Sequence, residues 1–146
     1  MNSAVGSSGR PTCRAATIEL HVDRTVKAFM APERWLALLG IRHTARGRSR
    51  FRHGLSTDLP LRPECATDVT DRTMDELLRT LKARGAPTEC VLVKDGLSSD
   101  ELADLDTALA RVLASASGAL VSCIPGELAL AQTGDGRRYL LTPHPE

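Results

Sequence analysis

The feature that most constrains this chain is the ordered succession of amphipathic stripes and short apolar runs in its second half. Four apolar residues recur at steps of three and four and predict a helix with one apolar face: Met74, Leu77, Leu78 and Leu81. Thr73 and Glu76 have the spacing of a capping box at the start of this helix. Gly85 and Pro87 predict its end.

A short run rich in β-branched residues follows, Cys90 to Val93, and indicates a strand covered on both faces. Ser98 and Glu101 have the spacing of a second capping box. The helix that they are expected to open carries one apolar face: Leu102, Leu105, Leu109, Val112 and Leu113. The apolar run at residues 119–124 then predicts another buried strand. We therefore expect a βαβ crossover that joins two parallel strands.

The end of the chain has the pattern of an antiparallel meander. Pro125 and Gly126 are the usual central pair of a type II turn, and residues 133–136 predict a second turn before Tyr139 to Leu141. The expected fold class is α/β (α+β-like). It combines a small mixed sheet, a βαβ crossover followed by a C-terminal antiparallel meander, and two helices packed on one face.

The first half is much less regular. Residues 1–16 are rich in Gly and Ser and predict a disordered N-terminal tail. Residues 17–65 predict a basic arm or weakly ordered extension with one strand, at 17–22, and one short helix, from Pro32 to Gly40. From Ile41 to Pro63 we expect a loop. Residues 66–146 are expected to form one compact α/β domain.

Charge divides between the halves. Residues 1–65 carry 11 Lys and Arg against 5 Asp and Glu, whereas residues 66–146 carry 8 against 13. Either a basic arm binds an acidic partner, or one half of the chain covers the other. The 4 Cys are scattered and no apolar stretch is long enough for a membrane span, so we expect a cytoplasmic, bacterial-type small protein that does not enter membranes.

The clearest local motif is a row of arginines at every second residue: Arg46, Arg48, Arg50 and Arg52. In an extended chain these side chains would share one face, as candidates for contact with nucleic acid or another polyanion. Phe51 would be available for stacking on a base. The alternative is that the arginines are solvated or neutralise the acidic second half.

A second group of residues is a candidate pocket, made by Asp95, Asp100, Asp104 and Cys123. Asp95 would follow a strand, and Asp100 and Asp104 would lie on one face of the next helix. The alternative is that these acids stabilise a helix start, and that Cys123 is a packing residue. No metal site, cofactor or catalytic residue is predicted, because no Cys or His pair has zinc spacing and no nucleophile motif occurs.

These observations lead to three functional hypotheses. The first is a small non-enzymatic module for protein interaction or regulation, with an accessory, immunity or antitoxin-like role. It would bind a protein partner, or a second copy, through an edge strand at Tyr139 to Leu141. The second is a nucleic-acid-binding protein that uses the Arg-rich segment 42–53. The third is a small enzyme with a site near Asp95 or Cys123.

Overall fold

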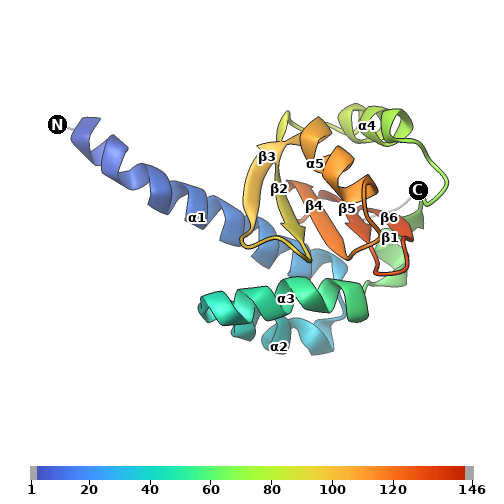
Figure 1. Ribbon diagram of the computed structural model, residues 1–146, viewed down its shortest axis with the longest axis horizontal. Helices are drawn as coiled ribbons and strands as arrows, with labels where there is room; N and C mark the ends of the chain where they lie inside the picture. The colour runs from blue at the N-terminus through green and yellow to red at the C-terminus, as the bar shows by residue number, and fades with distance from the viewer. Residues whose placement is uncertain (1–2, 144–146) are drawn as a thin grey trace.

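The computed structural model describes residues 3–143, and for residues 3–13 only the backbone. Its centre is a 6-stranded sheet in the order β1-β6-β5-β4-β2-β3, in which every pair of neighbours is antiparallel. The strands are β1 (Ala66–Asp68), β2 (Glu89–Lys94), β3 (Glu101–Asp104), β4 (Ala119–Ile124), β5 (Leu128–Gln132) and β6 (Arg138–Leu141). Helices cover both faces of this sheet (Figure 1).

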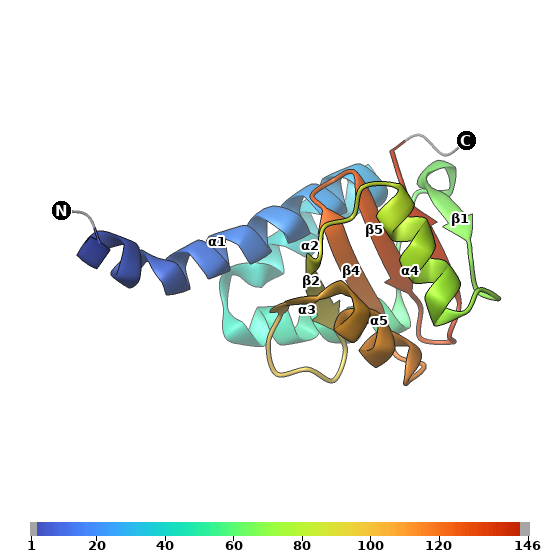
Figure 2. The same cartoon turned by 90° about the horizontal axis from the view of Figure 1, so that it is seen from above.

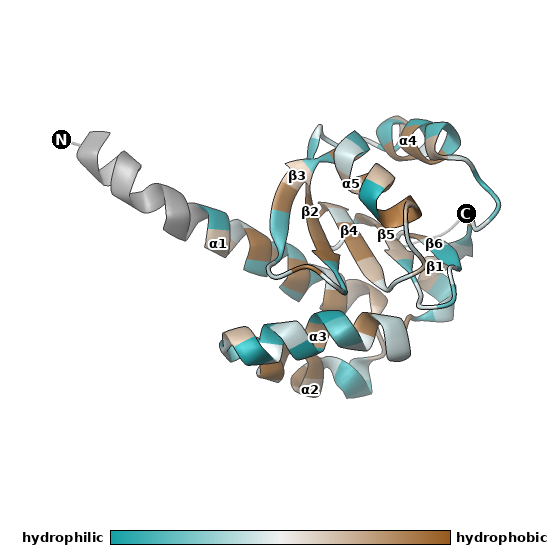
Figure 3. Cartoon of the chain, in the orientation of Figure 1, coloured by the Kyte–Doolittle hydropathy of each residue, from teal (hydrophilic) through white to brown (hydrophobic). Residues whose placement is uncertain are grey.

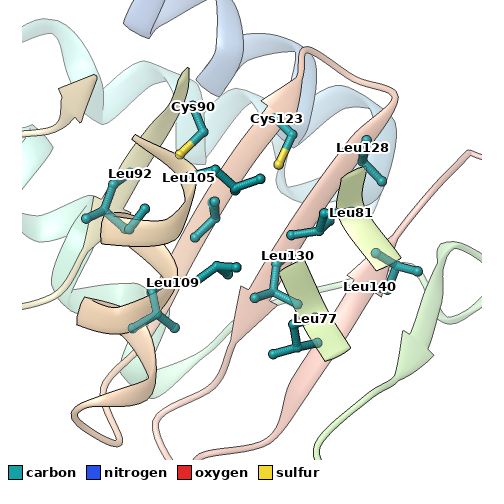
Figure 4. Close-up of a cluster of buried hydrophobic side chains, with 14 of the residues drawn as sticks. Leu77, Leu81, Cys90, Leu92, Leu105, Leu109, Cys123, Leu128, Leu130 and Leu140 are labelled. Atoms are coloured by element: carbon teal, nitrogen blue, oxygen red, sulfur yellow. The ribbon is translucent and has the colours of Figure 1, made fainter. Parts of the chain in front are cut away.

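One face of the sheet packs against α4 (Met74–Ala83) and α5 (Leu105–Leu113). Leu77 and Leu81 of α4 and Leu109 of α5 are buried against strand residues that include Cys90 and Cys123 (Figure 4). The predicted pair of helices on one face is therefore present. Together with the sheet it makes an α+β fold, as the sequence predicted.

The opposite face packs against α1 (Ser3–Phe29) and α3 (Ala45–Thr57). Val26 and Phe51 are buried there against Val91, Val93 and Leu120, which alternate along their strands with the residues of the first core. Between these two helices lie α2 (Trp35–Gly40) and the 3-10 turns η1 (Pro32–Arg34) and η2 (Ile41–His43), and a further 3-10 turn, η3 (Pro63–Cys65), precedes β1.

Several local predictions are confirmed. Thr73 Oγ1 accepts a hydrogen bond from the Glu76 amide at 3.2 Å, and the Glu76 carboxylate accepts one from the Thr73 amide at 2.9 Å. The Pro125–Gly126 turn closes with a 2.9 Å hydrogen bond from the Glu127 amide to the Ile124 carbonyl. Gly126 has a φ of 70°, which is the left-handed conformation that a type II turn requires.

The strand pairing differs from the expected parallel crossover. Residues Glu101–Asp104 form strand β3, and the second helix of this half begins only at Leu105. Because β3 reverses the chain once more, β4 runs antiparallel to β2, with Val91 opposite Ser122. The supposed capping box at Ser98 therefore lies in the loop before a strand, and the sheet is antiparallel throughout.

The prediction that Tyr139 to Leu141 form an edge strand is also wrong. Strand β6 lies between β5 and β1, and Thr67 pairs with Leu140. Since β1 occupies the outer position, the backbone groups of Tyr139 to Leu141 are paired on both sides. The outer strands of the sheet are β1 and β3.

The first half is helical where a tail, a strand and a loop were expected. Helix α1 includes residues 3–16 of the expected tail and the expected strand 17–22. The alternation of Ile18, Leu20 and Val22 suggested a strand, but Val22 continues at helical steps to Val26 and Phe29, which are fully buried. Leu20 is consequently 44% exposed. The N-terminal part of α1 extends beyond the sheet (Figures 1 and 2).

Within residues 3–143, no helix has both the length and the apolar character needed to cross a lipid bilayer.

Candidate functional site

The row of arginines lies on helix α3 and not on an extended segment. Thr44 caps this helix, and its hydroxyl accepts a hydrogen bond from the Gly47 amide at 3.0 Å. In a helix, residues two apart point about 200° from one another, so the row divides between two faces. Arg46 and Arg50 are exposed, whereas Arg52 is buried and Arg48 is half-buried. The predicted single face of four guanidiniums is therefore not formed.

Phe51 is not available for stacking on a base, because it is buried in the core under α3. Its ring instead contacts the guanidinium of Arg42, whose carbon lies 4.8 Å from the ring centroid. Arg42 is itself buried, in η2. The aromatic residue of the Arg-rich segment thus holds an arginine in place inside the protein.

Asp100 is the centre of a buried ion network. Its two carboxylate oxygens lie 2.6 Å from Arg42 Nη2 and 2.9 Å from Arg52 Nη1. The side chains of all three residues are at most 6% exposed. This network attaches the loop before β3 to η2 and α3. Part of the charge excess in the first half therefore neutralises an acid of the second half, as one of the two interpretations of the charge asymmetry expected.

Glu19 of α1 completes the network from the outside. Its carboxylate accepts hydrogen bonds from Arg42 Nε at 3.1 Å and from Arg42 Nη2 at 2.7 Å. Burial alone would lower the pKa of Arg42, but the carboxylates of Glu19 and Asp100 raise it above its ordinary value. Two nitrogens in the network, Arg42 Nη1 and Arg52 Nε, are buried and have no hydrogen-bond partner in the described part of the chain.

Asp95 belongs to a different contact, at the C-terminal end of α3. Its carboxylate accepts a hydrogen bond from Ser56 Oγ at 2.7 Å and lies 3.4 Å from His53 Nδ1. Ser56 Oγ in turn accepts a hydrogen bond from the Gly118 amide at 2.7 Å. Asp95 and Asp100 thus both attach the sheet to α3, by different partners.

Asp104 and Cys123 do not join these aspartates. Asp104 is exposed at the end of β3 and precedes α5, where its side chain makes no capping hydrogen bond. Cys123 is buried in the core on the opposite face of the sheet, beside Cys90 (Figure 4). Burial raises the pKa of both thiols to about 12. The four residues of the predicted pocket therefore lie at separate places.

A buried histidine contact connects α1 to the sheet. His21 Nδ1 lies 2.7 Å from Ser122 Oγ, to which Thr25 Oγ1 donates at 3.2 Å. Burial lowers the pKa of His21 below its ordinary value of 6.5, which favours the neutral imidazole. His21, Thr25 and Ser122 are all buried, and their contact packs α1 against β4.

The exposed surface made by α2, η2 and the outer side of α3 was not predicted. Leu36 is 91% exposed and Ile41 is 36% exposed. Ile41 lines a hollow of about 350 Å³ between α2 and α3, together with residues that include Leu38, Leu59 and Arg50. Figure 3 shows the apolar residues of α2 next to the mostly hydrophilic α3. We call Leu36, Leu38, Ile41, Arg50 and Leu59 the α2–α3 surface.

The sequence contained a signal for part of this surface. Leu36, Leu38 and Leu39 are too many apolar residues for one face of a helix of 6 residues, so some had to be exposed.

Comparisons of the chain with models of protein families, with curated proteins and with solved structures found no match.

Proposed function

We propose that this protein is a small non-enzymatic interaction or regulatory module that binds a partner protein through the α2–α3 surface. The observation that carries the proposal is an apolar hollow between α2 and α3 that is lined by Leu38 and the 36% exposed Ile41, with the 91% exposed Leu36 on the same helix as Leu38. A single exposed leucine is ordinary, but a hollow of about 350 Å³ with apolar lining, on the helix that carries this leucine, is typical of a binding surface.

The charge of the surface indicates the chemistry of the partner. Arg46 and Arg50 are exposed on the outer side of α3, and in the described part of the chain neither forms an ion pair. The nearby acid Asp58 is already paired with Arg34 at 2.8 Å. An amphipathic segment with apolar anchors and acidic flanking residues complements this arrangement.

The test compares partner capture by the full chain and by the variant Leu36→Lys, which changes only an exposed side chain. A protein captured by the wild type is purified, and its dissociation constant is measured against both. We expect Leu36→Lys and Arg50→Glu each to weaken binding by at least about tenfold. The control is Leu20→Lys on α1, where 44% of the residue is exposed. Equal binding by wild type and Leu36→Lys would contradict the proposal.

A second candidate function, nucleic-acid binding, is favoured by one observation. Arg46, Arg50 and His53 are exposed on α3 at a spacing that places them on the same side of the helix. Binding to phosphates would weaken steeply as salt rises, and Arg46→Ala with Arg50→Ala would remove it. Arg52→Ala is unsuitable for this test because Arg52 is buried. Salt-independent binding, or binding that survives the double variant, would contradict this candidate.

A further inference from the structure

We propose that the cavity between α1, the start of α3 and the loop before β3 binds a small oxyanion carried on a short apolar body. The cavity has a volume of about 430 Å³. Its charged and polar lining comes from Glu19, Arg48, Arg52, Ser98, Ser99 and Asp100. This site is separate from the α2–α3 surface, and the proposal does not depend on the function proposed above.

The acids of the cavity are already neutralised. Both oxygens of Asp100 accept hydrogen bonds from buried arginines, and both oxygens of Glu19 accept hydrogen bonds from Arg42. Arg48 has no carboxylate partner among the described residues, and one of its nitrogens donates to the Arg42 carbonyl at 3.0 Å. Three guanidiniums thus face two carboxylates, which leaves one positive charge uncompensated.

The network also has donors without acceptors. Arg52 lines the cavity and its side chain is 6% exposed, yet its Nε has no hydrogen-bond partner among the residues that the structure describes. Arg42 Nη1, which does not line the cavity, also has no hydrogen-bond partner among the described residues. A buried N–H without an acceptor costs about 1–3 kcal/mol, and more for a charged group. An anion in the cavity would neutralise Arg48, and it would give Arg52 Nε an acceptor once this guanidinium turned toward the cavity, because the nitrogen has almost no accessible surface as it lies.

The remaining lining defines the class of ligand. Ser98 and Ser99 supply hydroxyl groups, while Ala15, Ile18 and Ala45 supply apolar surface. The volume exceeds that of a bare inorganic ion, which occupies about as much space as a few waters. The ligand is therefore a small phosphate monoester or a short-chain carboxylate. The two share the oxyanion that the arginines would bind.

The test is isothermal titration calorimetry of the full chain at constant ionic strength. Propyl phosphate is the probe in one arm and butyrate in the other, so that the two probes differ mainly in the oxyanion. We expect saturable binding with a dissociation constant of about 1 mM in at least one arm, and the stronger arm identifies the source of the oxyanion. Arg48→Met should weaken this binding by at least about tenfold, because it removes a charge-assisted contact.

A second variant keeps the proposal testable if Arg48→Met disturbs the fold. Ala45→Glu adds a carboxylate to the cavity, at the first residue of α3. An acid there suits the helix dipole and should preserve stability while it repels the anion. The matched control is Arg79→Met at an exposed position of α4, away from this cavity and from the α2–α3 surface, which should bind as the wild type does. No saturable binding up to about 20 mM, or equal binding by wild type and Ala45→Glu, would overturn the proposal.

Discussion

Arg52 and Asp100 form an ion pair of 2.9 Å across 48 positions of sequence, with both side chains almost completely buried. The pair connects the middle of α3 to the loop that precedes β3. Because Asp100 also pairs with Arg42, one buried carboxylate contacts two buried cations. The contribution of Asp100 to stability is therefore larger than that of an ordinary surface acid.

Replacing Asp100 with Ala should lower the free energy of unfolding by about 3–5 kcal/mol, because two arginines would remain buried beside an empty position. The control is Glu101→Ala, which removes the neighbouring acid from a pair with Arg111 that is more than a third exposed. This control should cost less than about 1 kcal/mol. Urea denaturation measures the free energy of unfolding of both variants. Similar losses of stability in the two variants would show that the ion network around Asp100 does not stabilise the fold as expected.

His21 should make stability depend on pH. Because burial lowers the pKa of His21, the unfolded chain binds more protons than the folded protein just below pH 6.5. The His21 contribution is fully present above that pH and is lost as the pH falls through the window between 6.5 and the lowered folded pKa. His21→Gln should flatten the stability profile in this window. His43→Gln, at an exposed position, should leave it unchanged, and unfolding at a series of pH values compares the three proteins.

Gly118 is required by a close approach of two backbones. A Cβ at this position would overlap the backbone of Leu55 and Ser56 at the end of α3. Gly118→Ala should therefore lower the free energy of unfolding by about 1–3 kcal/mol. In contrast, a Cβ at Gly54, within α3, meets nothing within 4 Å, and Gly54→Ala should raise stability by about 0.5–1 kcal/mol. Thermal unfolding distinguishes the two variants by the opposite signs of their Tm shifts.

The thiols of Cys90 and Cys123 should be unreactive in the folded protein. With a pKa of about 12, only about one thiol in ten thousand is ionised at about pH 8. In a background that carries Cys13→Ser and Cys65→Ser, a thiol reagent should modify Cys90 and Cys123 only at the rate at which the protein unfolds. Modification in urea supplies the reference rate. Fast modification under native conditions would show that the core around these residues opens.

Predictions from local signals succeeded where the signal was specific to one conformation. Thr73 with Glu76, and Pro125 with Gly126, require a particular backbone, and both occur as expected. By contrast, Glu101 to Asp104 has an amphipathic pattern that suits a helix or a strand. Pairing with β2 makes it a strand, and that pairing depends on contacts distant in sequence.

The Arg-rich segment shows how a pattern can mislead. The alternation from Arg46 to Arg52 suggested an extended chain, whereas Gly47, Phe51 and Leu55 recur every four residues and form the buried side of α3. The pairing of Arg52 with Asp100 could not be read from either pattern, because it joins segments that come together only in the folded protein. The α2–α3 surface was missed for a related reason, since no local rule says which apolar residues remain uncovered.

The position of α1 and α3 over the sheet has a practical consequence for work with fragments. A fragment that begins at Ala66 would keep all 6 strands but would expose to water the apolar side chains that these helices cover: Val91, Val93, Leu120, Ala129, Ala131 and Leu141. We expect such a fragment to precipitate or self-associate when expressed alone. Binding measured with such a fragment would then occur at the newly exposed face of the sheet and could not be attributed to the native protein.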